Sequence, residues 1–251
     1  MEDKILSQFE STPARFGLPI LDAALGGGIP RGSVILLEDE IGVEADLITL
    51  HFLTEGLRGG ETGFILSTEH PFKYYDDNLR VLGINAEVLL ETDRMVYIDA
   101  FSNPYGYSDM RSKFKNVVNN ITQPRVVSES IRRSLLHTQN QQISCRGIID
   151  SISAIMLASE NVRTSLSFVQ NRIASNKDDG TVTLMTLHRD IHDEHDLKAL
   201  EHLVDGVIRV TAGDEAFSTI KIIKLRGSYT YSKKPMAMTV SAGQLSVIEY
   251  Q

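Results

Sequence analysis

The sequence predicts an α/β fold with a mostly parallel sheet and antiparallel strands at its C-terminal end. Between residues 33 and 203, short apolar runs alternate with longer runs of helical periodicity. This alternation is typical of parallel strands that are joined by helices. After Gly206 the helical runs stop, and strand-like runs follow one another across short turns. Such a tail indicates antiparallel strands at one side of the sheet.

The first half of the chain contains alternating helices and strands. Leu18, Leu21 and Leu25 fall at helical spacing, and the glycine-rich run GGGIPRG at 26–32 ends that helix. Gly59 and Gly60 end a second helix in the same way. The predicted elements are helices over 18–25, 45–58 and 72–82, and strands over 33–37, 63–67 and 95–99.

The second half continues this pattern and then changes to strands. We expect two helices between residues 108 and 140, separated near Pro124. A strand ending at 148–150, a helix over 162–175, a strand over 181–187 and a helix over 195–203 follow. The tail contains strand-like runs at 206–212, 217–225, 235–240 and 244–250. With no linker-like stretch inside it, residues 17–251 are predicted to form a single domain after an N-terminal arm at 1–16.

Composition excludes several classes of protein. The 251 residues carry a net charge of −8, which makes nucleic acid an unlikely partner because binding to it rests on neutralising phosphates. The single cysteine, Cys145, excludes an internal disulfide and is read as a structural thiol. The chain opens without a secretory signal pattern and contains no apolar run of membrane-spanning length. We therefore expect a cytoplasmic protein with no membrane contact.

The segment 34–53 reads as a buried strand, a tight loop and a helix, the arrangement in which nucleotide-binding folds hold phosphate. A phosphate-binding loop needs glycines, a Lys for the β- and γ-phosphates and a hydroxyl for Mg²⁺. Here the loop carries five acids within nine residues: Glu38, Asp39, Glu40, Glu44 and Asp46. The scaffold of an ATPase is therefore predicted without its phosphate chemistry.

Four motifs make the chain resemble a known family. They are GGGIPRG at 26–32, TEHP at 68–71, GIIDS at 147–151 and KLRGS at 224–228. With these motifs the chain resembles the KaiC, RadA and GvpD branch of the RecA superfamily, from about residue 17 to the C-terminus. The resemblance implies a RecA-like three-layer fold. It also implies that Glu69 corresponds to a catalytic acid, Asp150 to the Walker B acid, and Lys224 and Arg226 to residues that reach a nucleotide held by the neighbouring subunit.

The phosphate loop departs from the family pattern. Asp39 and Glu44 stand where the family has glycines, Ala45 replaces the Lys and Asp46 replaces the Ser or Thr, so that Gly42 is the glycine that remains. Thr68 also replaces the first of two acids that follow the second strand. Fold alone does not carry function, and we predict that Glu69 and Asp150 are vestigial. The structural interpretation of Glu69 is an acid at the N-terminus of the next helix. That of Asp150 is a buried acid at the end of a strand, paired with a backbone donor or capping the next turn.

The predicted function is a non-hydrolysing pseudo-ATPase that needs no cofactor and acts through protein contacts, as a homo-oligomer or with a KaiC-like paralogue. A first alternative is an ATPase that still binds ATP and Mg²⁺ through an atypical loop. A second is a recombination accessory protein that binds single-stranded DNA, which the net charge disfavours.

Two smaller predictions remain. Lys224 and Arg226 are expected at an intersubunit contact, where Glu44 and Asp46 of a neighbour would take the place of a phosphate. His188, His192 and His195 fall at i, i+4 and i+7 and would share one face of a continuous helix, which makes them weak candidates for a metal site. A solvated loop is the alternative interpretation, both for the histidines and for the acidic loop.

Overall fold

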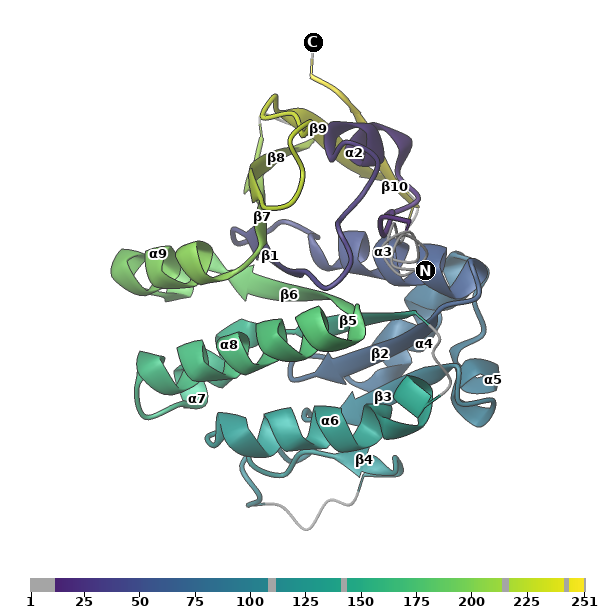
Figure 1. The fold of residues 1–251 in the computed structure, drawn as a ribbon, viewed down its shortest axis with the longest axis vertical. Helices are drawn as coiled ribbons and strands as arrows, with labels where there is room; N and C mark the ends of the chain where they lie inside the picture. Colours follow the sequence, from purple (N-terminus) through teal and green to yellow (C-terminus); the bar gives the residue numbers. More distant parts are fainter. Residues whose placement is uncertain (1–11, 108–111, 141–143, 214–216, 242–243, 251) are drawn as a thin grey trace, which may run out of the picture.

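The computed structural model describes residues 12–107, 112–140, 144–213, 217–241 and 244–250. Within them the strands form one ten-stranded sheet in the order β10-β9-β8-β7-β1-β6-β5-β2-β3-β4 (Figure 1). Their bounds are β1 Val34–Asp39, β2 Thr62–Ser67, β3 Met95–Asp99, β4 Asn116–Val117, β5 Cys145–Asp150, β6 Val182–His188, β7 Gly206–Ala212, β8 Ser218–Leu225, β9 Met236–Ser241 and β10 Gln244–Glu249. In this order the seven strands from β7 across to β4 pair in parallel, whereas β8, β9 and β10 pair antiparallel with their neighbours. The predicted α/β fold is confirmed.

Helices cover both faces of the parallel part of the sheet, which gives three layers (Figure 1). Along β1 the side chains alternate, with Val34 and Leu36 in the core under one helix layer and Ile35 and Leu37 in the core on the other face. One layer contains α6 (Pro124–Asn140), α7 (Ile152–Ala158), α8 (Val162–Asp179) and α9 (Glu194–Leu203). The other contains α3 (Asp46–Arg58), α4 (Phe72–Val81) and α5 (Ala86–Glu91), and α2 (Pro19–Ala24) packs beside β10.

The structure differs from the prediction around Pro124. One described helix, α6, occupies 124–140, and the short strand β4 precedes it, while residues 108–111 lie outside the described part. Pro124 begins the helix because the first helical position needs no backbone N–H donor. Helices α5 and α7 were not predicted, and each begins at a polar cap, Asn85 or Ser151, whose side chain accepts a backbone hydrogen bond.

Residues just before position 17 pack against the predicted domain. Ala14 pairs with Ile29 through two backbone hydrogen bonds, and Ala14 and Phe16 are fully buried. The Phe16 ring packs against Phe52 of α3 at 5.1 Å between centroids. Residues 1–11 of the predicted arm lie outside the described part. None of the helices in the described residues combines the length and apolar character that crossing a membrane requires.

Candidate functional site

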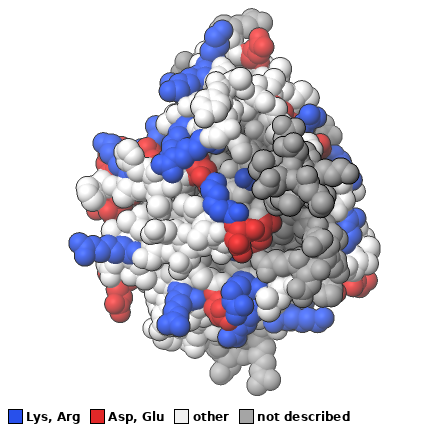
Figure 2. Space-filling view, viewed as in Figure 1, with Lys and Arg blue, Asp and Glu red and all other residues white. Residues whose placement is uncertain are grey.

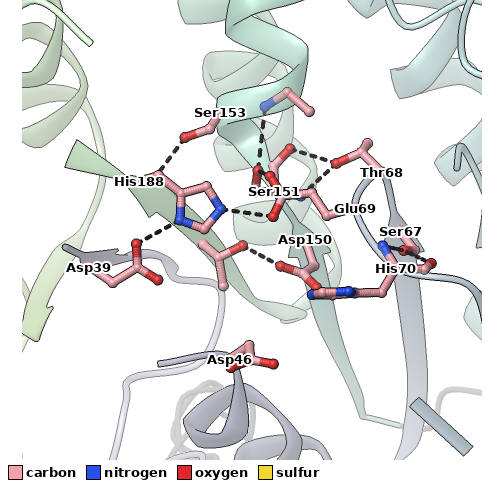
Figure 3. Close-up of polar contacts among 12 residues, drawn as sticks. Asp39, Asp46, Ser67, Thr68, Glu69, His70, Asp150, Ser151, Ser153 and His188 are labelled. Atoms are coloured by element: carbon pink, nitrogen blue, oxygen red, sulfur yellow. Dashed lines mark hydrogen bonds and ion pairs between the residues drawn. The ribbon is translucent and has the colours of Figure 1, made fainter. Parts of the chain in front are cut away.

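The carboxyl ends of four adjacent parallel strands, β1, β6, β5 and β2, define the candidate site (Figure 3). Asp39 ends β1 beside His188, which ends β6, and Asp150 ends β5 beside Ser67, which ends β2. Open α/β sheets bind ligands beyond the carboxyl ends of their strands. Polar side chains that the sequence separates by more than a hundred residues therefore meet where a nucleotide would be expected.

The loop between β1 and α3 holds the residues that the sequence predicts in place of a phosphate-binding motif. Gly42 has a φ of 86°, a conformation that glycine adopts without strain. The Ile41 N–H donates to Asp190 Oδ2 at 2.8 Å, and the Glu40 carboxylate accepts a bond from the Ala212 N–H at 3.1 Å. Ala45 is fully buried at the end of the loop and offers no ammonium group. Contacts with the protein itself thus hold this loop.

Two of the five acids assigned to the loop belong to strand β1, which is longer than predicted. Glu38 is fully buried, and its Oε2 atom accepts hydrogen bonds from Arg189 at 2.9 Å and Arg209 at 2.8 Å. The same two arginines donate to Glu201 of α9. Burial raises the pKa of Glu38, against the effect of Arg209. The interpretation of Glu38 as part of a solvated or anion-repelling loop is wrong.

Asp46, at the position of the missing hydroxyl, is the first residue of α3 and accepts a hydrogen bond from the Tyr74 hydroxyl. The Tyr74 ring stacks on His70 with centroids 4.0 Å apart. Figure 3 shows Asp46 across the site from Asp150 and His70. Burial, together with the charge of Asp150, raises the pKa of Asp46 to about 6. A carboxylate is therefore held in a pinned, partly desolvated position at the start of α3.

Asp150 is buried at the end of β5 and both its oxygens are bonded. Oδ2 accepts a bond from the Tyr75 hydroxyl at 2.6 Å, and Oδ1 accepts one from the Thr186 hydroxyl at 2.7 Å. The Tyr75 oxygen also lies 2.8 Å from Ser67 Oγ. Burial raises the pKa of Asp150. The interpretation of Asp150 as a buried acid at a strand end describes its place, but its partners are side chains, and the cap of α7 is Ser151.

His188 joins two of the predicted site residues. Its Nδ1 atom lies 2.7 Å from Asp39 Oδ1 and its Nε2 atom 2.8 Å from Glu69 Oε2 (Figure 3). Hydrogen bonds to Asp39 and then to Glu69 raise the pKa of His188 to about 10, so an imidazolium donates to both carboxylates at neutral pH. Burial, together with the charges of Glu69 and Asp150, raises the pKa of Asp39 despite this contact.

Glu69 does not act as the N-terminal acid of the next helix, as was expected. Helix α4 begins without a side-chain cap, and Glu69 instead accepts bonds from His188 and from the Ser151 hydroxyl. Burial opposes its ionisation, but these two bonds outweigh burial and hold the pKa of Glu69 below its ordinary value. Thr68, at the position of the family's first acid, accepts a bond from the Ser151 N–H at 2.7 Å. This turn is therefore tied to the end of β5.

The predicted helical face of three histidines does not exist. His188 lies in β6, a 3₁₀ turn over Arg189–Ile191 follows it, and His195 lies in α9. His192 Nε2 lies 2.9 Å from Ser153 Oγ, whereas the side chain of His195 is exposed beside Asp196. In the part of the chain that the structure describes, no group of three or more His, Cys, Asp or Glu residues is arranged to hold a metal ion.

Lys224 and Arg226 contact the C-terminal end of α9 within the same chain. Lys224 Nζ donates to the carbonyl oxygens of Glu201, His202 and Val204 at 2.7, 3.1 and 2.6 Å. Arg226 donates to the carbonyls of His202 and Leu203, so both cations satisfy the free carbonyls at a helix end. Burial, then the charge of Arg226, lowers the pKa of Lys224 to about 8. Contact with a neighbouring subunit stays a prediction.

Sequence reasoning missed the aromatic and hydroxyl partners of the site. Tyr74 and Tyr75 are adjacent in α4, yet one bonds Asp46 and the other Asp150. Thr186 lies in an apolar strand and faces Asp150. The signal was a pair of tyrosines a few residues after TEHP, in a position where an amphipathic helix buries one and leaves the other at its edge.

Comparisons with known proteins agree along almost the whole chain. A family model described as the KaiC ATPases matches residues 14–251. The UPF0273 protein of Thermotoga maritima is 27% identical over 229 residues, which is 89% of this chain and 91% of that protein. The UPF0273 protein of Pyrococcus horikoshii is 24% identical over 89% of both chains. The circadian clock protein KaiC3 of Synechocystis is 30% identical over 88 residues, 35% of this chain and 17% of that protein.

Proposed function

Because the chain belongs to the KaiC family of ATPases, we propose that it is a member without nucleotide hydrolysis that acts through contacts with other proteins. One observation carries the proposal. The positions of the phosphate-binding Lys and the Mg²⁺-binding hydroxyl hold Ala45, which is buried, and Asp46, which is bonded to Tyr74. An ATPase needs a cation and a hydroxyl at these two positions.

The charges at the site favour exclusion of a triphosphate. Asp39, Asp46 and Asp150 lie around the carboxyl ends of the strands (Figure 3), where the phosphates of a nucleotide would be expected. Two like unit charges 4 Å apart repel by about 4 kcal/mol at an effective dielectric constant of 20. The N-terminus of α3 attracts an anion by only about 0.3–1 kcal/mol. Each ionised carboxylate at such a distance therefore outweighs the attraction that the helix offers.

The cation of the site is already used. His188 donates one N–H to Asp39 and the other to Glu69, so neither remains for a phosphate oxygen. Glu69, which would activate water in a working ATPase, accepts bonds from His188 and Ser151. Asp150, which would hold Mg²⁺ through water, accepts bonds from Tyr75 and Thr186. The two acids of the family pattern support the protein's own structure in this proposal.

Exposed apolar side chains beside the loop support a role in protein contacts. Ile41, at the tip of the loop, is 81% exposed, and its N–H bonds the residue before the exposed Ile191. Large apolar side chains that lie together on a surface are typical of binding sites. The proposed partner is a second copy of this chain or a KaiC-like paralogue.

Titration calorimetry with MgATP, followed by measurement of phosphate release, tests the proposal. We expect no heat of binding and no release at millimolar ATP. The matched variant carries Ala45→Lys and Asp46→Thr, which restore both missing groups and should bind MgATP more tightly than the natural chain. An increase of about 2.7 kcal/mol in the free energy of unfolding of the natural chain when MgATP is added would refute the proposal, because a ligand gives this amount at a hundred times its Kd. Binding without release would favour an ATP-binding protein with an atypical loop.

A further inference from the structure

A groove between α6 and α8 has a different charge from the rest of the molecule. Its volume is about 600 Å³, and its charged lining consists of Arg125, Arg132, Arg133, Arg172 and Glu129. The groove is thus strongly cationic, although the chain as a whole carries −8. In Figure 2, drawn from the same side as Figure 1, Lys and Arg side chains gather over α6 around a smaller acidic spot. Nothing in the carboxyl-end site accounts for this concentration of arginine.

Arg172 forms the buried floor of the groove. It is 7% exposed, and its Nε–H donates to Asn176 Oδ1 at 2.9 Å. Its nearest carboxylate, Asp179, lies 3.9 Å from the guanidinium, too far for a hydrogen bond. Among the described residues the other four N–H groups of Arg172 have no hydrogen-bond acceptor, and burial lowers the pKa of Arg172. A largely buried guanidinium that uses one of its five donors keeps the others for an anion that enters the groove.

The other arginines leave a surplus of positive charge at the rim. Arg132 and Arg133 both bond the single carboxylate of Glu129, at 2.7 Å each. Arg125 is exposed and makes no ion pair or hydrogen bond with the described residues. Glu129 is the acid in the lining beside four arginines, and Asp179 lies 3.9 Å from Arg172 outside it, so an incoming anion meets attraction from the rim as well as from the floor.

The remaining lining favours a small molecule with an apolar part. The apolar part of the lining consists of Ala174 and of the nearly buried edges of Ile131, Leu135 and Phe168, and Ser128 and Ser175 add hydroxyl groups. The volume lies in the range of small-molecule sites, which are mostly apolar with a few converging polar groups. Arg172 is in the last turns of α8, the helix that leads into the amino end of β6, so the groove is separate from the site at the carboxyl ends.

We propose that this groove binds a small organic phosphate, with the phosphoryl group on Arg172 and the organic part against Phe168 and its apolar neighbours. The planar guanidinium donates two parallel hydrogen bonds to a phosphate. The three arginines at the rim favour a doubly charged phosphate over a singly charged carboxylate with the same organic part.

Three ligands separate the contributions to binding. Phenyl phosphate has both parts, inorganic phosphate lacks the apolar part, and benzoate carries the same ring with a single charge. Calorimetry or NMR titration should show phenyl phosphate binding with a Kd of about 1 mM or below, roughly tenfold more tightly than either of the others. Absence of phenyl phosphate binding at about 10 mM, or equal binding of benzoate, would overturn the proposal.

Variants locate the site. Arg172→Lys keeps the charge and loses the fork, and should weaken phenyl phosphate binding about tenfold. Arg125→Ala changes an exposed residue that folding does not need, and should weaken binding a few-fold even if Arg172→Lys fails to fold. Arg163→Ala is the matched control, because Arg163 is exposed on α8, the helix that carries Arg172, but lies outside the groove. If Arg125→Ala binds phenyl phosphate as the natural chain does, the assignment is wrong.

The same variants keep this inference distinct from the proposed function. Any MgATP binding that disappears in Arg125→Ala belongs to the groove, whereas binding that persists there and changes with Ala45→Lys and Asp46→Thr belongs to the carboxyl-end site. If one of the two proposals is refuted, the other can therefore still be tested.

Discussion

Neutralising Asp46 should stabilise the protein. Burial and the charge of Asp150 raise the pKa of Asp46 from its ordinary value of 3.8 to about 6. Such a shift corresponds to about 3 kcal/mol of destabilisation when the group is ionised. Asp46→Asn removes this charge and keeps an oxygen that accepts the bond from Tyr74. Loss of an acid from the N-terminus of α3 costs about 0.3–1 kcal/mol, so the expected net gain is about 2 kcal/mol.

The gain has a defined dependence on pH. A carboxyl group with a raised pKa in the folded state contributes no destabilisation below its unfolded pKa of 3.8, and its cost grows until the pH passes about 6. The variant should therefore gain its full stability at pH 8, and about two thirds of the effect should be absent at pH 4.5. For a chain of this length a gain of about 2 kcal/mol raises Tm by about 4–8 °C.

Thermal unfolding of the natural chain, Asp46→Asn and Glu44→Gln at the two pH values is the assay. Glu44→Gln is the matched control, since it removes a charge from the same loop at an exposed position. It should change Tm little at either pH. An Asp46→Asn variant that is no more stable than the natural chain at pH 8, or that gains equally at both pH values, would refute the reasoning that Asp46 is held in a charged, desolvated position.

Three other predictions follow from the same residues. His188→Asn leaves Asp39 and Glu69 without their shared cation and should lower the free energy of unfolding in urea at pH 7 by about 2 kcal/mol, less than for a fully buried pair because the His188 side chain is 36% exposed. The stabilisation by His188 is complete below pH 6.5 and is lost as the pH rises through about 10. An equal loss of stability in the variant His195→Asn, at an exposed position, would contradict this prediction. The triple variant Glu44→Gly, Ala45→Lys and Asp46→Thr should bind MgATP but hydrolyse it slowly, because Asp39 and Thr68 remain. Robust phosphate release would show that these two residues do not prevent hydrolysis. Light scattering without nucleotide should find that the natural chain is an oligomer at micromolar concentration. The variants Arg226→Ala and Asp46→Ala should have a lower mass, since breaking a desolvated pair costs about 2–5 kcal/mol. A monomeric natural chain, or an unchanged mass in both variants, would refute the predicted pairing between subunits.

Much of the fold could be predicted from local patterns. The strands over 63–67 and 95–99 and the helix over 162–175 are recovered in β2, β3 and α8, because apolar periodicity reports burial on one face or on both. Errors arose where a local signal has two meanings. Pro124 can separate two helices or begin one, and here it begins α6. Glu38 looked like a loop acid because a buried carboxylate in a strand is rare unless distant arginines pair with it.

The sequence by itself determined which side chains stand in the loop after the first strand. Ala45 and Asp46 carry neither an ammonium group nor a hydroxyl in any conformation of the chain, and these are the groups that a phosphate loop uses. Only the tertiary structure decided what the remaining acids do, since pairing depends on which strand ends are neighbours. The sheet order places β1 beside β6 and β5 beside β2, and so His188 reaches both Asp39 and Glu69 across 149 and 119 residues of sequence. Spacing along the chain carries no information about such distances. Three histidines therefore resembled a helical face, whereas His188 lies in β6, His192 follows a 3₁₀ turn and His195 lies in α9.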